Sequence, residues 1–149
     1  MVHVMKASNS SDMAVLAWVK LLRAQTSVLA AVEADLKAAG FPPLSWYDVL
    51  LELGRAKSHA LRPRELEARL LLAQHNVSRL IDRLMAKNLV RKKPTAEDGR
   101  GLMVEITHEG RDLQRRMWPV YRRAIERHVG LKLTSTEAKN LAGLLAKLT

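Results

Sequence analysis

The feature that most constrains the fold of this chain is an apolar helix pattern that runs directly into a charged hairpin, within residues 77–106. Four apolar residues recur at helical spacing in its first part: Val77, Leu80, Ile81 and Leu84. One face of a helix there must therefore be buried. Asn88 follows at the position where a left-handed residue ends a helix. Two short strands are predicted next, at 90–93 and 102–106, with a polar turn between them.

Further helices are predicted on both sides of this segment. Residues 12–39 keep helical spacing, and a second helix begins at Ser45 as its cap. Pro63 opens a short third helix, since proline suits a first helical position. Thr107 caps a long helix after the hairpin, and residues 134–137 form a capping box that opens the last helix. The predicted fold class is mainly α with a small β-hairpin.

Composition excludes several classes of function. The 149 residues include no cysteine, so disulfides and thiolate metal sites are excluded, and the five histidines lack the spacing of metal ligands. No glycine-rich phosphate loop, nucleophile elbow or HExxH motif occurs, and we therefore predict no enzyme, no cofactor and no metal site. We expect no signal peptide, and no segment that approaches the roughly 20 apolar residues of a membrane span. A cytoplasmic protein is the expectation.

The charge of the chain points to a polyanionic partner, either nucleic acid or an anionic membrane surface. The net charge is +10, and residues 62–100 hold ten Lys and Arg against five acids. A basic run alone is more often only a solvated surface. Here it coincides with a short helix, a turn, a second helix with a polar outer face and a basic hairpin. That order is typical of a winged helix-turn-helix, whose second helix fits the major groove of DNA.

The outer face of this second helix and the hairpin carry the predicted DNA contacts. Five residues are predicted on the helix: His75, Asn76, Ser78, Arg79 and Arg83. Arg79 is expected to read a base, since arginine can donate two hydrogen bonds to guanine. Lys92 and Lys93 are expected near phosphates. Arg100, between two glycines and braced by Asp98, is expected in the minor groove. The alternatives are an exposed helix face without a partner and a plain turn.

Two stretches of the chain resemble the multiple-antibiotic-resistance regulator (MarR) family of bacteria: VSRLIDRLMAKNLVRKK and EDGRGLMVEITHEGRDL. They look like the recognition helix of that family, its wing with an Asp-x-Arg tip and its entry into the next helix. Asn88, Gly99 and Ile106 depart from the family pattern. The resemblance implies a homodimeric transcription regulator, usually a repressor, that binds a palindromic operator in double-stranded DNA. It also implies a small aromatic or phenolic effector.

The predicted organisation is a single MarR-like chain, 1–149, with the winged helix-turn-helix at 44–107. Helices at 12–40 and 108–149 are predicted to form the dimer. The first helix and a leucine stripe from Leu141 to Leu148 offer more apolar surface than the DNA-reading part can bury, and exposed surface of that size indicates an interface.

An effector pocket is predicted between the dimer helices and the DNA-reading part. Its predicted lining is Trp18, Arg23, Trp46 and Tyr47. The alternative is that these aromatic residues belong to the core. For the whole protein, the alternative is a winged helix that binds a protein or RNA without operator-specific DNA binding. RNA readers more often carry exposed stacking aromatics, which are sparse here.

Overall fold

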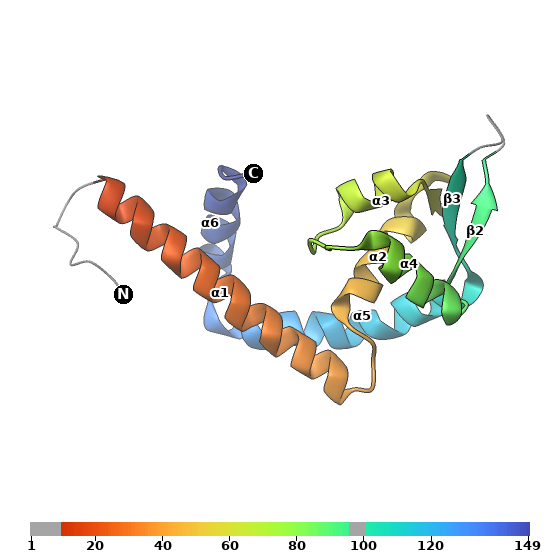
Figure 1. The fold of residues 1–149 in the computed structure, drawn as a ribbon. Coiled ribbons are helices and arrows are strands. Elements are labelled where there is room, and N and C mark those ends of the chain that lie inside the picture. The colour runs from red at the N-terminus through yellow and green to blue at the C-terminus, as the bar shows by residue number, and fades with distance from the viewer. Residues whose placement is uncertain (1–9, 96–100) are drawn as a thin grey trace. The chain divides into compact units, whose positions relative to one another are not determined.

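The computed structural model describes residues 10–95 and 101–149. Its helices and strands are α1 (Ser10–Ala38), α2 (Leu44–Arg55), β1 (Ala60–Leu61), α3 (Pro63–Arg69), α4 (Val77–Ala86), β2 (Val90–Pro94), β3 (Leu102–Ile106), α5 (His108–His128) and α6 (Ser135–Ala146). Short 3-10 turns lie at Lys57–His59 and Gly130–Lys132. The described chain is thus mainly helical with a small antiparallel sheet, which confirms the predicted fold class (Figure 1).

The chain divides into two compact units. The described residues up to Ala34 form one unit together with Ala124–Thr149, which we call the arm unit. Asp35–Arg123 form the other, which we call the head unit. Helices α1 and α5 each contribute residues to both units.

The core of the head unit is made by the apolar faces of three helices and the sheet. Helix α4 contacts β2, while α2 and α3 contact β3. In Figure 1 these three helices lie on one side of the β2–β3 hairpin. Fully buried side chains in this core are Leu50, Leu53, Leu66, Leu84 and Val104. Burying one such leucine stabilises a fold by about 1.5–3 kcal/mol, so α4 is held firmly beside the sheet.

The sheet has a third strand that the sequence did not predict. Its order is β1-β3-β2, and the short β1 pairs antiparallel with β3, with Ala60 opposite Glu105 and Leu61 opposite Val104. Two residues are too few to show the alternation that indicates a strand. Strand β1 exists because Ala60 and Leu61 are both buried and because the edge of β3 offers unpaired backbone groups.

The boundaries of two elements depend on their caps. The prediction that Ser45 caps the second helix is wrong: Pro43 holds the N-cap position of α2, without a side-chain hydrogen bond. The ring of Pro43 already fixes its φ, at −56°, before the first turn. In contrast, Asn88 has a φ of 59°, which confirms the predicted left-handed turn after α4.

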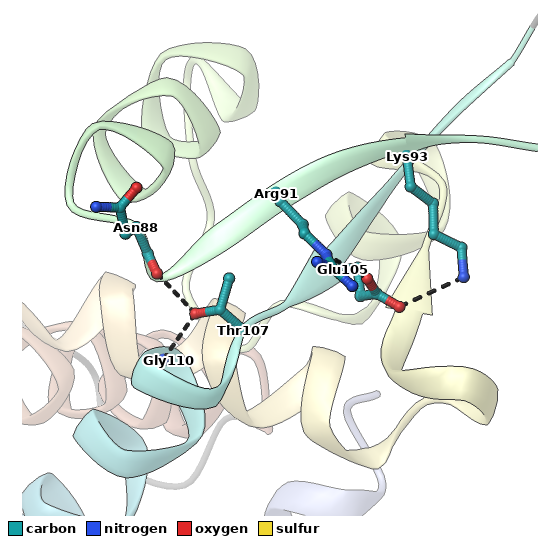
Figure 2. A network of polar contacts seen from close by, with 6 residues as sticks. All are labelled: Asn88, Arg91, Lys93, Glu105, Thr107 and Gly110. Carbon is teal, nitrogen blue, oxygen red and sulfur yellow. Dashed lines mark hydrogen bonds and ion pairs between the residues drawn. The ribbon is translucent and has the colours of Figure 1, made fainter.

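A threonine joins this turn to the start of α5. The hydroxyl of Thr107 donates to the Asn88 carbonyl oxygen at 2.7 Å and accepts the Gly110 N–H at 3.0 Å (Figure 2). The predicted Thr107 cap is therefore confirmed, and it has a second function. Because the same hydroxyl bonds both segments, the end of α4 and the root of the hairpin are fixed to each other.

The arm unit exposes much apolar surface. Helix α6 opens with the predicted capping box, in which Thr134 and Glu137 exchange hydrogen bonds with each other's backbone N–H at 3.1 and 2.9 Å. Large apolar side chains that are exposed on α1 and α6 are Met13, Val15, Leu16, Trp18, Leu22, Leu141 and Leu144. A surface of this kind is unusual for an isolated soluble chain.

Helix α1 is also long and apolar enough to cross a membrane, judged by length and composition alone. Within Ser11–Ala38 the mean hydropathy reaches 1.4 over 18 residues, so the prediction that no segment approaches a membrane span is wrong. Lys20 and Arg23 lie in the middle of this helix. A lysine or arginine at the centre of a bilayer costs about 3 kcal/mol, whereas at a protein interface it can reach water.

Candidate nucleic-acid interface

Helix α4 presents one buried face and one polar exposed face. Val77, Leu80, Ile81 and Leu84 are buried, as predicted. Ser78, Arg79 and Arg83 are exposed, as is Asp82. Within residues 10–95 and 101–149, the guanidinium groups of Arg79 and Arg83 have no hydrogen-bond or ion-pair partner. Two long cationic side chains on this face are therefore available to a ligand.

Two residues predicted on this helix lie outside it. His75 is in the preceding loop, and Asn76 is the N-cap of α4. The Asn76 side-chain oxygen accepts the backbone N–H of Arg79 at 3.0 Å. Asparagine prefers the N-cap because its side chain can satisfy a helix N–H that has no partner in the first turn. The NH2 group of the Asn76 side chain remains able to donate a hydrogen bond to DNA. The DNA contacts of His75 and Asn76 stay predictions.

A buried carboxylate fixes the loop between α3 and α4. Asp48 of α2 is only 6% exposed, and its Oδ2 accepts the backbone N–H of Leu72 at 2.8 Å. Because a buried carboxylate is costly without a donor, this contact ties the loop to α2. Sequence analysis did not identify Asp48. The available signal was an acidic residue between the apolar Tyr47 and Val49.

The register of the hairpin separates its basic residues onto two faces. Arg91 lies opposite Glu105 and Lys93 opposite Met103, while Lys92 lies opposite the buried Val104. Side chains alternate along a strand, so Lys92 shares a face with the buried Val90, although its own side chain is exposed, and the other two are on the opposite, outer face. Lys92 has no ion-pair partner among the residues that the structure describes.

Glu105 binds both outer cations. Arg91 Nε lies 2.6 Å from Oε1 of Glu105, and Lys93 Nζ lies 3.3 Å from Oε2 (Figure 2). The hydrogen bond from Arg91 is the main reason why the pKa of Glu105 is lowered from its ordinary value, and the bond from Lys93 adds to it. Lys93, which was predicted to lie near phosphates, is also engaged within the hairpin by this ion pair, and its DNA contact stays a prediction. Glu105 was not identified from sequence, although strand alternation places it on the same face as the two cations.

Two contacts lie at Thr95 and Gly101, which we call the neck of the hairpin: a backbone hydrogen bond and the close approach of an arginine. The Thr95 N–H donates to the Gly101 carbonyl oxygen at 3.0 Å. Arg62, the N-cap of α3, reaches this neck so closely that a Cβ on Gly101 would lie 2.7 Å from its Nη1. The predicted tip residues Asp98 and Arg100 lie outside the described residues.

Of the four predicted pocket residues, Tyr47 is the one that lines a cleft of the head unit. The cleft has a volume of about 340 Å³ between α2, the loop after α3 and Tyr121. Tyr47 also belongs to an aromatic cluster, with ring centroids 5.1 Å from Tyr121 and 6.3 Å from Trp118. Trp46, the residue before Tyr47 in the sequence, is half-buried. Trp18 and Arg23 are exposed and belong to the arm unit.

Helix α3, a turn, helix α4 and a basic antiparallel hairpin make the head unit a winged helix-turn-helix. Residues 39–101 match the model of the MarR family. The chain is similar to this family over that segment, and its fold is that of solved MarR family structures.

Several known proteins are similar to this chain. The transcriptional regulator PrsX of Escherichia coli is 35% identical over 66 residues, which cover 44% of this chain and 40% of PrsX. The chain thus matches about two fifths of that relative's length. Sco3205, a MarR family regulator of Streptomyces coelicolor crystallised with DNA, has a TM-score of 0.81 and 23% identity over 97% of this chain and 89% of its own. BpsR of Bordetella bronchiseptica, whose DNA binding is regulated by 6-hydroxynicotinic acid, has a TM-score of 0.76 and 23% identity over 86% of this chain and 89% of its own.

Proposed function

We propose that this chain is a sequence-specific, double-stranded DNA-binding transcription regulator that acts as a homodimeric repressor. The observation that carries the proposal is the exposed face of α4, where Arg79 and Arg83 are available beside a basic hairpin. A ten-residue helix is about 15 Å long, which suits a major groove about 12 Å wide. The DNA complex of Sco3205 supports this function by likeness of fold.

Within this proposal the residues divide into two kinds of contact. Arg79 is in the first turn of α4, the part of a recognition helix that contacts base edges. Ser78 and Arg83 on the same face, and Lys92 on the hairpin, suit contacts with phosphates, which position the protein without reading sequence. His75, Asn76, Asp98 and Arg100 are proposed as further contacts.

The exposed apolar residues of α1 and α6 support a homodimer. A second copy of the chain presents the same surface, and two-fold symmetry would bring the two apolar faces together. Two winged helices related by that axis read a palindrome, with half-sites about one helical turn of DNA apart. The repressor activity and the palindromic operator are proposals that rest on the similarity of this chain to the MarR family.

We also propose a small aromatic or phenolic effector, with the cleft beside Tyr47 as its site. A volume of about 340 Å³ is within the range of ligand pockets, and Arg55 and Arg69 line it together with Tyr121. The loop tied down by Asp48 lines the same cleft. An occupant that disturbs the Asp48–Leu72 contact would shift the start of α4 and weaken DNA binding. The regulation of BpsR by 6-hydroxynicotinic acid supports this proposal.

Two measurements test the function. Titration of labelled random duplex DNA at about 50 and 200 mM salt should give binding that falls steeply with salt, as phosphate contacts require. Selection of bound sites from a random duplex pool should then enrich a palindrome. Binding to RNA but not to duplex DNA, or the absence of any enriched sequence, would favour the alternative of a winged helix that binds RNA or protein.

A further inference from the structure

The outer face of the hairpin carries one carboxylate between two cations. Glu105 accepts a hydrogen bond on each oxygen, from Arg91 at 2.6 Å and from Lys93 at 3.3 Å (Figure 2). The Glu105 side chain is 14% exposed, whereas those of Arg91 and Lys93 are 69% and 45% exposed. The carboxylate is therefore largely covered, whereas the two cations that bind it face solvent.

The register shows in which direction Lys93 is drawn. Its partner on β3 is Met103, and Glu105 lies two residues farther from the hairpin tip. Two residues of a strand span about 7 Å, so the ammonium group is directed toward the root of the hairpin. Lysine on a solvated strand could otherwise extend toward the tip, where a wing meets DNA.

The carboxylate is charged under physiological conditions. The pKa of Glu105 is lowered, first by the hydrogen bond from Arg91 and then by that from Lys93. Only an ionised carboxylate binds two cations at once, because a protonated oxygen would present a donor to one of them. The contact thus persists throughout the neutral pH range.

We propose that Glu105 is a specificity-determining residue, which holds Arg91 and Lys93 on the outer face of the hairpin and withholds both charges from DNA phosphates. The inference rests on the proposed DNA binding. Phosphate contacts are independent of sequence and supply nearly all of the affinity for random DNA. Holding back two cations lowers that affinity and leaves base reading by α4 intact, so the preference for operator over random DNA is larger.

The test is Glu105→Gln, which keeps the size of the side chain and removes its charge. Random duplex DNA and the selected operator are titrated with parent and variant over a range of salt. Each released phosphate contact adds about 0.9 to the slope of log affinity against log salt. The variant should steepen that slope by up to about 2 for each protomer bound, bind random duplex at least about threefold more tightly at low salt, and reduce the ratio of operator to random affinity.

A charge-matched control is available in the same unit. Asp112→Asn also removes one negative charge and frees one cation, because Asp112 pairs with Arg116 at 3.1 Å on α5. This variant should leave the slope close to that of the parent. An equal effect of both variants would overturn the inference, since it would assign the effect to net charge alone.

A second variant covers the case in which Glu105→Gln folds poorly. The double substitution Arg91→Ala with Lys93→Ala should leave the random-duplex slope of the parent nearly unchanged, because the parent withholds both cations from DNA. A slope reduced by about 2 for each protomer bound would overturn the inference. Weaker random-duplex binding by a folded Glu105→Gln protein would also overturn it and assign Glu105 a structural role. A parent that binds no duplex at all would instead reject the proposed function.

Discussion

Replacing Gly110 by alanine tests how closely the hairpin root packs on α5. Gly110 is buried in the first turn of α5, and a Cβ there would collide with the carbonyl oxygen of Leu89. It would also lie 2.9 Å from Cγ1 of Ile106 and 3.1 Å from Cδ2 of Leu50. The Leu89 carbonyl cannot easily yield, because it accepts the Thr107 N–H at 3.1 Å. The first turn of α5 must therefore move.

The magnitude follows from the contacts that this movement breaks. Overpacking a tight site costs about 1–3 kcal/mol, and loss of the Gly110–Thr107 hydrogen bond costs about 1 kcal/mol. Part of this loss is offset, because alanine in a helix stabilises the fold by about 0.5–1 kcal/mol relative to glycine. We expect Gly110→Ala to lower the free energy of unfolding by about 2 kcal/mol, or Tm by roughly 8–16 °C in a unit of this size.

The assay is thermal and urea unfolding, with Gly54→Ala as the matched control. Gly54 lies in α2 of the same unit, and the structure places no atom within 4 Å of a Cβ built there. The same substitution should therefore leave stability unchanged or raise it by up to about 1 kcal/mol. If Gly110→Ala unfolds at the parent's midpoint, the close approach of Leu89 to α5 is refuted.

Three further predictions concern the proposed dimer, Arg100 and pH. Removing residues 129–149 deletes α6 and its exposed leucines, so sedimentation should report monomers; a dimer would exclude α6 as the main contact. Arg100→Ala should weaken operator binding at least tenfold, or about 1.4 kcal/mol, with an unchanged Tm, and binding equal to the parent at matched salt would exclude insertion of this arginine in the minor groove. Because the folded-state pKa of Glu105 is lowered, its ion pairs contribute stability above the ordinary pKa and lose it as pH falls through the lowered value. The difference in unfolding free energy between parent and Glu105→Gln should therefore be present at neutral pH and vanish in acid; a difference that does not change with pH would contradict the assignment.

The elements that sequence predicted correctly are those specified by neighbouring residues. The buried face of α4, the left-handed Asn88, the Thr107 cap and the strand β3 all depend on spacing within a few positions. The amphipathic period and the cap preferences act locally, so they can be recognised in one dimension. The class of fold followed from the order of these elements.

The features that sequence missed depend on partners far along the chain. Strand β1 exists through pairing with β3, more than forty residues later. Asp48 matters because Leu72 lies against it, and Glu105 because the register places Arg91 opposite. A slip of one residue would reverse the faces of a strand, and the sequence alone did not define that register. The arginine contact at the neck of the hairpin is likewise a tertiary contact.

The remaining wrong prediction for α4 concerns the residue at which this helix begins. His75 and Asn76 continue the polar periodicity of α4, so they were assigned to its outer face. Asn76 instead caps the helix, and its side-chain oxygen is engaged by the Arg79 N–H. An N-cap residue can fit the same sequence periodicity as the helical residues that follow it. Only the backbone conformation shows which of them belong to the helix. Arg79 itself, inside the first turn, keeps the exposed position that base reading requires.

Base reading by Arg79 of α4 is measured by titrating Arg79→Ala and parent against the selected operator and its single-base-pair variants at one salt concentration. We expect a loss of about 1–3 kcal/mol, roughly 5- to 150-fold in Kd, confined to one symmetric position, with preference relaxed there and kept elsewhere. Equal weakening at every sequence, random duplex included, would contradict it and assign Arg79 to phosphate.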